Sequence, residues 1–342
     1  MPMLCGVSAP RIVTAFGLPR LSVTSHHPDL RPLRRAAVRR DWPAVVDFFA
    51  GLPAEHDPSF AAEVVANVDG SETFLEPAVH GPLAPELAGT LLGARWVKMG
   101  WAARGARAAK YTKPEQFERF HAYLGRADEL LEQVTGGEPG NVSAWTTRVH
   151  IARGLSVGQA EARRRYEQAA RSRPHPFNAQ IALAQQLCPK WGGSFAQLHA
   201  FAAECAAQAP PGSLSAAVVA EAHIEQARAE KSATGWLRQP WVRAELSRAA
   251  ERSVDHPTYR PVHGWVMAHS RFAYAWTLAG DRPRAARHFA ALGNAMTDYP
   301  WKYWLGSGRT TYKARQLGAF GKSIGRGGDP ATDDLRSTPI LR

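Results

Sequence analysis

The stretch AWTLAGDRPRAARHFAALGNAMTDYP, residues Ala275 to Pro300, carries the pattern that decides the fold. Small and apolar residues continue a helical face up to Ala279, and Gly280 with Asp281 then supplies a helix stop and a helix cap. A second helical face follows, and its apolar positions are Ala285, Phe289 and Leu292. Proline cannot continue a helix, so Pro300 closes the segment. The stretch therefore predicts two helices joined by a short turn.

The spacing of this second helix recurs upstream. Each copy of the pattern is a small or apolar residue, two more such residues 4 and 7 positions after it, and a proline 12 positions after it. Three sets follow this pattern: Ala127, Leu131, Val134 and Pro139; Ala162, Tyr166, Ala169 and Pro174; Leu198, Ala202, Cys205 and Pro210. The sets are 35 and 36 residues apart, and the opening stretch is a weaker copy with its proline displaced. Offsets of four and seven put the three residues on one helix face. The sequence therefore predicts internal helical repeats.

Each of these predicted helices follows another helix with a small or apolar stripe: Ala144–Arg153, Asn178–Leu187, Ala216–Ala229 and Val262–Ala279. The unit is a helix, a short turn, a second helix and a proline break. No run of alternating β-branched residues indicates a strand. We therefore expect an all-α fold.

This unit resembles the tetratricopeptide repeat, and the opening stretch follows that family's order of small, Gly, Ala, aromatic and Pro positions. The resemblance covers about two thirds of the chain and implies a helix-pair solenoid, a superhelix with a concave groove that binds peptides or protein surfaces. Leu33–Pro53 matches a degenerate first unit. The unit from Ala216 to Pro257 departs from the family because GWLRQPW expands it, and several consensus Gly and Trp positions are absent.

The string CPKWGGS, residues Cys188 to Ser194, lies between two predicted helices. Ser194 precedes Gln197 by three residues, as in a capping box, and Ser156 precedes Gln159 in the same way in the unit before. We therefore interpret the string as an extended turn whose glycines permit positive φ. The alternative is an anion site at a helix N-terminus, with candidate binding residues Lys190, Trp191, Gly192, Gly193 and Ser194. The P-loop pattern GxxxxGK[ST] is absent, and no strand precedes the string.

KWGGS between helices of a degenerate tetratricopeptide-like array resembles an uncharacterised bacterial family that is recognised largely by this turn. The resemblance rests on Lys190 to Ser194 and the surrounding helical layout. That family has no assigned activity, catalytic residue or cofactor, so the resemblance implies an architecture and a compartment but no mechanism.

A basic stretch, RWVKMGWAARGARAAKYTK, runs from Arg95 to Lys113 without an acidic residue. Aromatic residues interleave with its candidate surface cations, which are Arg95, Lys98, Arg104, Arg107, Lys110 and Lys113. This composition suits contact with phosphates or with an acidic peptide. The favoured alternative is a helix whose aromatic residues face the core while its cations are solvated.

The chain contains no recognisable catalytic or metal-binding motif. HExxH, GxSxG, a Cys–His signature and a spaced acidic pair are all missing, and the three cysteines lack CxxC spacing. His263 and His269 are six residues apart, which on a helix leaves them about 120° from alignment. We therefore predict no catalytic residue, no cofactor and no metal ligand. The sequence favours a non-enzyme over an enzyme.

Composition sets the expected domain limits and the compartment. The chain has 342 residues, 45% of them hydrophobic, with a formal net charge of +12. We expect a loose segment over 1–29, a helical-repeat domain over 30–305 and a disordered, basic, Gly-rich tail over 306–342. Because no signal peptide and no apolar run of ~18 residues is present, we expect a cytoplasmic protein without a membrane span.

Three functions remain open from the sequence. The first is a non-catalytic interaction or scaffold protein that holds a peptide or partner protein in the concave groove. The second is nucleic-acid or anionic-ligand binding through residues 95–113 and the WGGS turn, to which the positive net charge would contribute. The third is an enzyme or small-ligand binder centred on that turn.

Overall fold

The computed structural model describes residues 19–105, 111–303 and 308–319. Those residues form seventeen α-helices and no strand, and their only β-type pairing is an isolated bridge between Arg20 and Ala295. The predicted all-α class is confirmed. None of the described helices is long and apolar enough to cross a membrane.

The helices follow one another with short connections. The first seven are α1 (Val23–His26), α2 (Arg31–Arg39), α3 (Trp42–Ala50), α4 (Pro58–Ala66), α5 (Glu72–Val79), α6 (Pro85–Arg104) and α7 (Pro114–Gly137). The next seven are α8 (Val142–Gly154), α9 (Gln159–Ser172), α10 (Phe177–Gln186), α11 (Phe195–Gln208), α12 (Ala217–Ala229), α13 (Ala233–Leu237) and α14 (Pro240–Arg252). The last three are α15 (Trp265–Leu278), α16 (Arg282–Leu292) and α17 (Gly308–Ala319). Three short 3-10 helices, η1 (Pro28–Leu30), η3 (Pro189–Trp191) and η4 (Trp301–Tyr303), lie between them.

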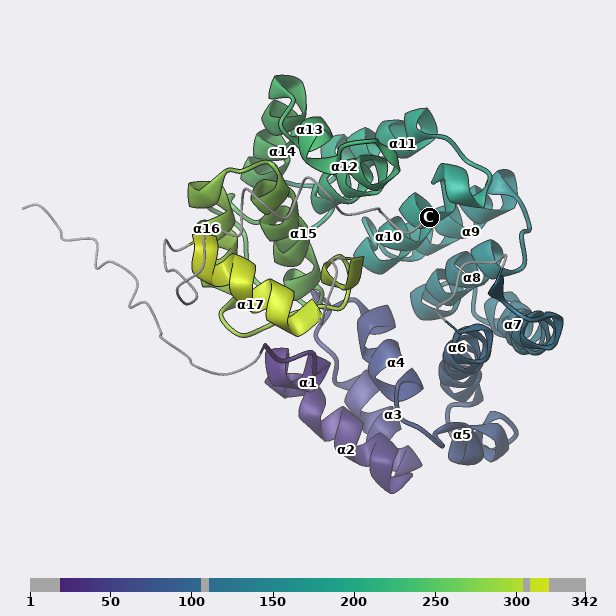
Figure 1. Cartoon of the computed structure of the whole chain (residues 1–342). Helices are drawn as coiled ribbons and strands as arrows, with labels where there is room; N and C mark the ends of the chain where they lie inside the picture. The colour runs from purple at the N-terminus through teal and green to yellow at the C-terminus, as the bar shows by residue number, and fades with distance from the viewer. Residues whose placement is uncertain (1–18, 106–110, 304–307, 320–342) are drawn as a thin grey trace, which may run out of the picture.

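Two kinds of helix alternate from α7 onward. Helices α8, α10, α12 and α15 are buried around most of their circumference, whereas α7, α9, α11 and α16 each bury one stripe. Every apolar residue of the predicted repeat pattern is buried within those stripes: Ala127, Leu131, Val134, Ala162, Tyr166, Ala169, Leu198, Ala202, Cys205, Ala285, Phe289 and Leu292. In Figure 1, α10 and α15 accordingly lie nearer the middle than α11 and α16. The predicted stripes are therefore the surfaces by which an outer layer packs on an inner one.

The chain closes on itself. The backbone N–H of Arg20 donates to Asn294 (2.8 Å), and the N–H of Met296 donates to Arg20 (3.1 Å). Asp29 lies 2.6 Å from Nε2 of His263. In Figure 1 the helices follow a circuit that brings α1 beside α17. The N-terminal helices therefore pack against the C-terminal ones.

Residues 308–319, predicted to be disordered, instead form α17. Tyr312 is fully buried, with ring centroids 4.9 Å from Trp301 and 5.3 Å from Phe289, and its hydroxyl donates to the carbonyl of Ala295. The prediction of disorder was wrong for these residues because α17 packs on the protein through Tyr312 and not through a long apolar face, which the sequence lacks. Trp301 is buried against the rings of Tyr274 on α15 and Phe289 on α16.

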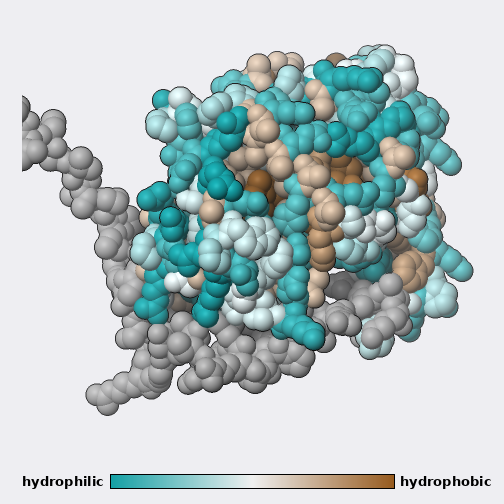
Figure 2. Space-filling model, turned by 90° about the horizontal axis from the view of Figure 1, so that it is seen from above, coloured by the Kyte–Doolittle hydropathy of each residue, from teal (hydrophilic) through white to brown (hydrophobic). Residues whose placement is uncertain are grey.

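Residues 19–29 of the predicted loose N-terminal segment likewise contain α1 and the start of η1, whereas residues 1–18, 306–307 and 320–342 lie outside the described residues. Figure 2 shows one face of the molecule, on which hydrophilic residues predominate and apolar residues form small separate spots.

Candidate functional site

The WGGS turn has the cap that the sequence predicts. The hydroxyl of Ser194 accepts a hydrogen bond from the backbone N–H of Gln197 (3.2 Å), at the start of α11. The side chain of Gln197 accepts from the Ser194 hydroxyl instead of reaching back to the backbone, so half of the capping box is formed. Gly192 has φ +86, and a Cβ at Gly193 would lie 2.1 Å from the carbonyl oxygen of Leu187. The fold of the turn itself therefore requires both glycines.

The second predicted cap, Ser156 with Gln159, is wrong. Ser156 has φ +54 and α9 begins only at Gln159, after Gly158 at φ +92. The side-chain amide of Gln159 instead donates to the carbonyls of Gln186 (2.9 Å) and Trp191 (3.0 Å). Gln159 therefore fastens the WGGS turn to the preceding helix pair.

The ring of Trp191 and the ring of Trp101 on α6 both lie against the same cationic side chain. The guanidinium of Arg153, on α8, lies 5.0 Å from the ring centroid of Trp101 and 5.4 Å from that of Trp191. Arg153 is half-buried, and none of the described residues forms a hydrogen bond with its enclosed Nε. Burial lowers the pKa of Arg153, but a guanidinium stays charged in proteins. No carboxylate pairs with Arg153 in the described part of the chain.

Lys190 contributes to a buried acidic pair on α12. Its ammonium lies 2.6 Å from Glu225, a residue 5% exposed, and Arg228 lies 3.1 Å from the same carboxylate. Burial acts to raise the pKa of Glu225, but the charges of Lys190 and Arg228 outweigh it and the net pKa lies below the ordinary value. The amide of Gln185 donates to Glu225 (2.9 Å) and to Glu221 one helical turn away (2.6 Å).

Glu221 is paired from the other side by α15. Nε of Arg271 lies 2.6 Å from the carboxylate, and the two residues are 3% and 1% exposed. The chain's own C-terminal segment covers this part of the site: Arg228 stacks 3.4 Å from the ring centroid of Tyr303, and Arg271 stacks 5.0 Å from that of Tyr299. Burial raises the pKa of Tyr299 well above its ordinary value.

The polar groups continue in the other direction to α4. Lys98, on α6, lies 3.6 Å from Glu63. Burial lowers the pKa of His150, on α8, to about 4, although the charge of Glu63 acts in the opposite direction. We call the whole set the inner polar row; its members are Glu63, Lys98, His150, Arg153, Gln185, Lys190, Glu221, Glu225, Arg228 and Arg271. The row joins the inner helices from α4 to α15 and is the candidate functional site.

The predicted basic surface is not one face. Arg95 is buried, with ion pairs to Glu72 (2.7 Å) and Asp69 (3.3 Å), because α6 packs on the chain just before and within α5. Lys98 belongs to the inner polar row, and Arg104 stacks on the ring of Trp101. Lys113 is exposed at the start of α7, whereas Arg107 and Lys110 lie outside the described residues.

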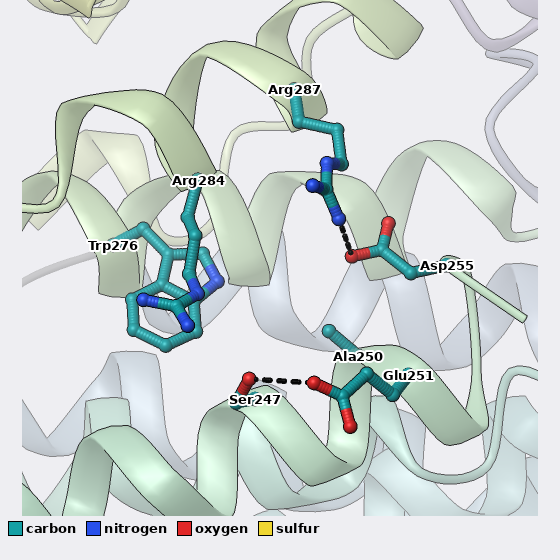
Figure 3. A pocket seen from close by; sticks show the side chains of 7 residues that line it. All are labelled: Ser247, Ala250, Glu251, Asp255, Trp276, Arg284 and Arg287. Carbon is teal, nitrogen blue, oxygen red and sulfur yellow. Dashed lines mark hydrogen bonds and ion pairs between the residues drawn. The ribbon is translucent and has the colours of Figure 1, made fainter.

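A small cavity of about 130 Å³ lies on the outer side, among α14, α15 and α16 (Figure 3). Its charged side chains and the hydroxyl of Ser247 are already bonded within the protein. Arg287 pairs with Asp255 (3.0 Å), Ser247 donates to Glu251 (2.9 Å), and Arg284 pairs with Asp281 outside the cavity lining. Each charged side chain of the cavity lining therefore already has a hydrogen-bond or ion-pair partner, and the cavity is a weaker candidate than the inner polar row.

The fold also assembles two groups of metal-ligating side chains that the sequence did not predict. They are His27, Asp29 and His263, and His199, His223 and Glu245; in each, one possible ligand atom per residue lies within 4.8 Å of the other two. His27 and Asp29 are two residues apart, but His263 and the members of the second group are too far from their partners in sequence for a spacing rule to connect them.

Comparison with known proteins adds no relative: no protein-family model, curated protein or solved structure matches this chain. Neither the tetratricopeptide repeat nor the family with the KWGGS turn is thus identified. What is established is an all-helical protein whose inner helices carry a row of charged groups.

Proposed function

We propose that this chain is a non-catalytic interaction protein that binds an acidic, extended peptide segment of a partner along the inner polar row. The proposal includes the interpretation that α6–α7, α8–α9, α10–α11, α12–α14 and α15–α16 are pairs of a tetratricopeptide-like solenoid. Alternation of inner helices with outer helices that bury one stripe supports that interpretation.

One observation carries the proposal: Arg153 is the cation of the row that lacks a carboxylate in the described structure. Lys98, Lys190, Arg228 and Arg271 all pair with glutamates. A half-buried guanidinium without a counter-ion is costly, and its planar donors match a carboxylate. A peptide carboxylate beside Arg153 would complete the row.

The tryptophans make this position selective. Trp101 and Trp191 pack against Arg153, so they restrict the rotamers of its long side chain and leave a defined approach for one anionic group. This gives a reason for the extra length of the WGGS turn, because that length carries Trp191 to the guanidinium.

The chain's own residues 299–303 support an extended occupant. They bring Tyr299 and Tyr303 against Arg271 and Arg228 at one end of the row. The partner segment would therefore use the other end, from Arg153 toward Glu63. Nucleic-acid binding is less favoured, because Arg95 and Lys98 already have acidic partners.

Fluorescence anisotropy with a labelled Glu/Ala/Tyr peptide, and a Lys/Ala/Tyr peptide of equal length, tests the proposal. Arg153→Met keeps an apolar chain between the tryptophans, and we expect it to weaken binding of the acidic peptide about 10-fold to 100-fold, as for loss of a charged hydrogen bond. Arg163→Met is the matched control, because Arg163 lies on the outer helix α9 and pairs with Glu204 and Glu167.

Equal affinity of both variants for the acidic peptide would show that Arg153 does not receive it. Failure of the acidic peptide to bind, together with binding of a duplex oligonucleotide that weakens steeply with salt, would replace the proposal by nucleic-acid recognition.

A further inference from the structure

The GWLRQPW expansion, Gly235 to Trp241, forms most of α13 and the start of α14. Its two tryptophans meet edge to face, with ring centroids 5.1 Å apart. Both lie against His223, at 6.2 Å for Trp236 and 5.7 Å for Trp241, and Trp236 also lies 6.5 Å from His199. The expansion therefore builds an aromatic wall around two histidines.

Three metal-ligating groups meet at this wall. His199, His223 and Glu245 come from α11, α12 and α14, and one ligand atom of each lies within 4.8 Å of the others. Ligands on separate regular helices are held more precisely than ligands on loops. His223 is fully buried, whereas the side chain of Glu245 is 40% exposed and leaves a path from solvent.

Hydrogen bonds fix the histidines in metal-binding forms. Gln226 donates through its amide to Glu230 (3.2 Å), so the Gln226 oxygen is the atom that faces Nε2 of His199 (2.7 Å). Nε2 of His199 must therefore carry the hydrogen, and Nδ1 keeps a lone pair. A histidine that donates its other N–H to a fixed acceptor is the usual second shell of a metal ligand.

His223 directs its Nε2 at the carboxylate of Glu245, and Nε2 is the atom that it would offer to a metal ion. Its Nε2 lies 2.9 Å from the Glu245 carboxylate, and its buried Nδ1 has no hydrogen-bond partner in the described parts of the chain. Burial lowers the pKa of His223 to about 3 and also lowers that of His199.

We propose that His199, His223 and Glu245 bind a divalent transition-metal ion, with Zn²⁺ as the preferred ion. Two imidazoles and one carboxylate form a common zinc ligand set, and water would complete the coordination. Adjacent ligand atoms on a tetrahedral zinc ion are roughly 3.4 Å apart. The present 2.9 Å between His223 and Glu245 therefore has to widen slightly, which the partly exposed glutamate side chain permits.

The second group, His27, Asp29 and His263, serves as the internal control. Two of its ligands belong to the short segment around η1, and His263 is stacked on His56 with ring centroids 3.8 Å apart. The 2.6 Å contact between His263 and Asp29 joins the N-terminal segment to the segment just before α15. This contact therefore already has a structural role.

Isothermal titration of the full chain with Zn²⁺ after chelator treatment, and the visible absorption of its Co²⁺ complex, test this site. Glu245→Gln and His199→Ala are expected to weaken binding at least about 10-fold, and Gln226→Ala about 10-fold through its second-shell role. Asp29→Asn should leave both measurements unchanged. Co²⁺ should also quench the fluorescence of Trp241. That fluorescence is measured as the emission of the wild type minus the emission of Trp241→Phe.

Absence of Zn²⁺ and Co²⁺ binding, or binding that survives both Glu245→Gln and His199→Ala, would overturn the proposal. Loss of binding in Asp29→Asn alone would overturn it as well, because the ion would then belong to the other group. Glu245 and His199 are not fully buried, so their variants are expected to fold, and unchanged circular dichroism checks this.

Discussion

Replacing Gly193 by alanine is expected to destabilise the protein by about 2–4 kcal/mol. The added Cβ would lie 2.1 Å from the carbonyl oxygen of Leu187 and 2.5 Å from its carbonyl carbon, whereas ordinary contact begins at 3.4 Å. Both contacts are with backbone atoms, so no side-chain rotation relieves them. Overpacking of this kind costs about 1–3 kcal/mol. Displacement of the turn would also weaken the Ser194 cap of α11, which contributes about 1 kcal/mol.

Urea unfolding followed by circular dichroism measures this change, and Gly125→Ala is the matched control. Gly125 lies inside α7 with no atom within 4 Å of the Cβ position. Alanine there should stabilise the chain by about 0.5–1 kcal/mol, because it restricts the unfolded backbone without a clash. If Gly193→Ala unfolds within about 0.5 kcal/mol of the wild type, the requirement for glycine in the WGGS turn is refuted.

Two further expectations concern buried charge. Arg271→Met should lower the free energy of unfolding by about 3–5 kcal/mol, because it leaves the carboxylate of Glu221, which is 1% exposed, without its cation. Adding Glu221→Gln to that variant should recover part of the loss. If the effects of the two substitutions measured by urea unfolding are simply additive, the two residues are not a coupled pair. Burial lowers the pKa of His288 from 6.5 to about 3. The unfolded state therefore binds more protons than the folded state between these values, and stability falls as pH decreases from 6.5 toward 3. His288→Phe should reduce the slope of the unfolding free energy against pH by an amount that corresponds to at most one proton. Equal slopes for the wild type and this variant would contradict the assignment.

The difference between the two predicted helix caps shows how much of the structure a local sequence motif can predict. Ser194 and Gln197 lie at a turn whose helix begins where the motif requires, so the predicted N-cap forms. Ser156 and Gln159 have the same spacing, yet the helix begins two residues later than the motif requires, with Gly158 as its N-cap. Gln159 is thereby free to bond with the carbonyl of Trp191, a contact 32 residues away that no local motif encodes.

The candidate site shows the same limit. The sequence singled out Lys190 and Trp191 because of their unusual turn, and both belong to or contact the inner polar row. It did not single out Glu221, Glu225 or Arg271, because single charges within apolar helical stretches look like ordinary variation. A possible signal was the i, i+4 glutamate pair on a helix predicted to be buried, since buried carboxylates need cations.

The sequence by itself determined the all-α class and the buried stripes of α7, α9, α11 and α16. These follow from the 3.6-residue period and from steric rules that act within a few residues. Only the tertiary structure decided that α17 docks on the last helices, that Arg95 is buried, and that Arg153 has no carboxylate partner among the described residues. It also decided that His199, His223 and Glu245 meet beside Trp236 and Trp241. Such encounters depend on where whole helices pack, and that packing is set by the summed burial of many apolar residues rather than by any one motif.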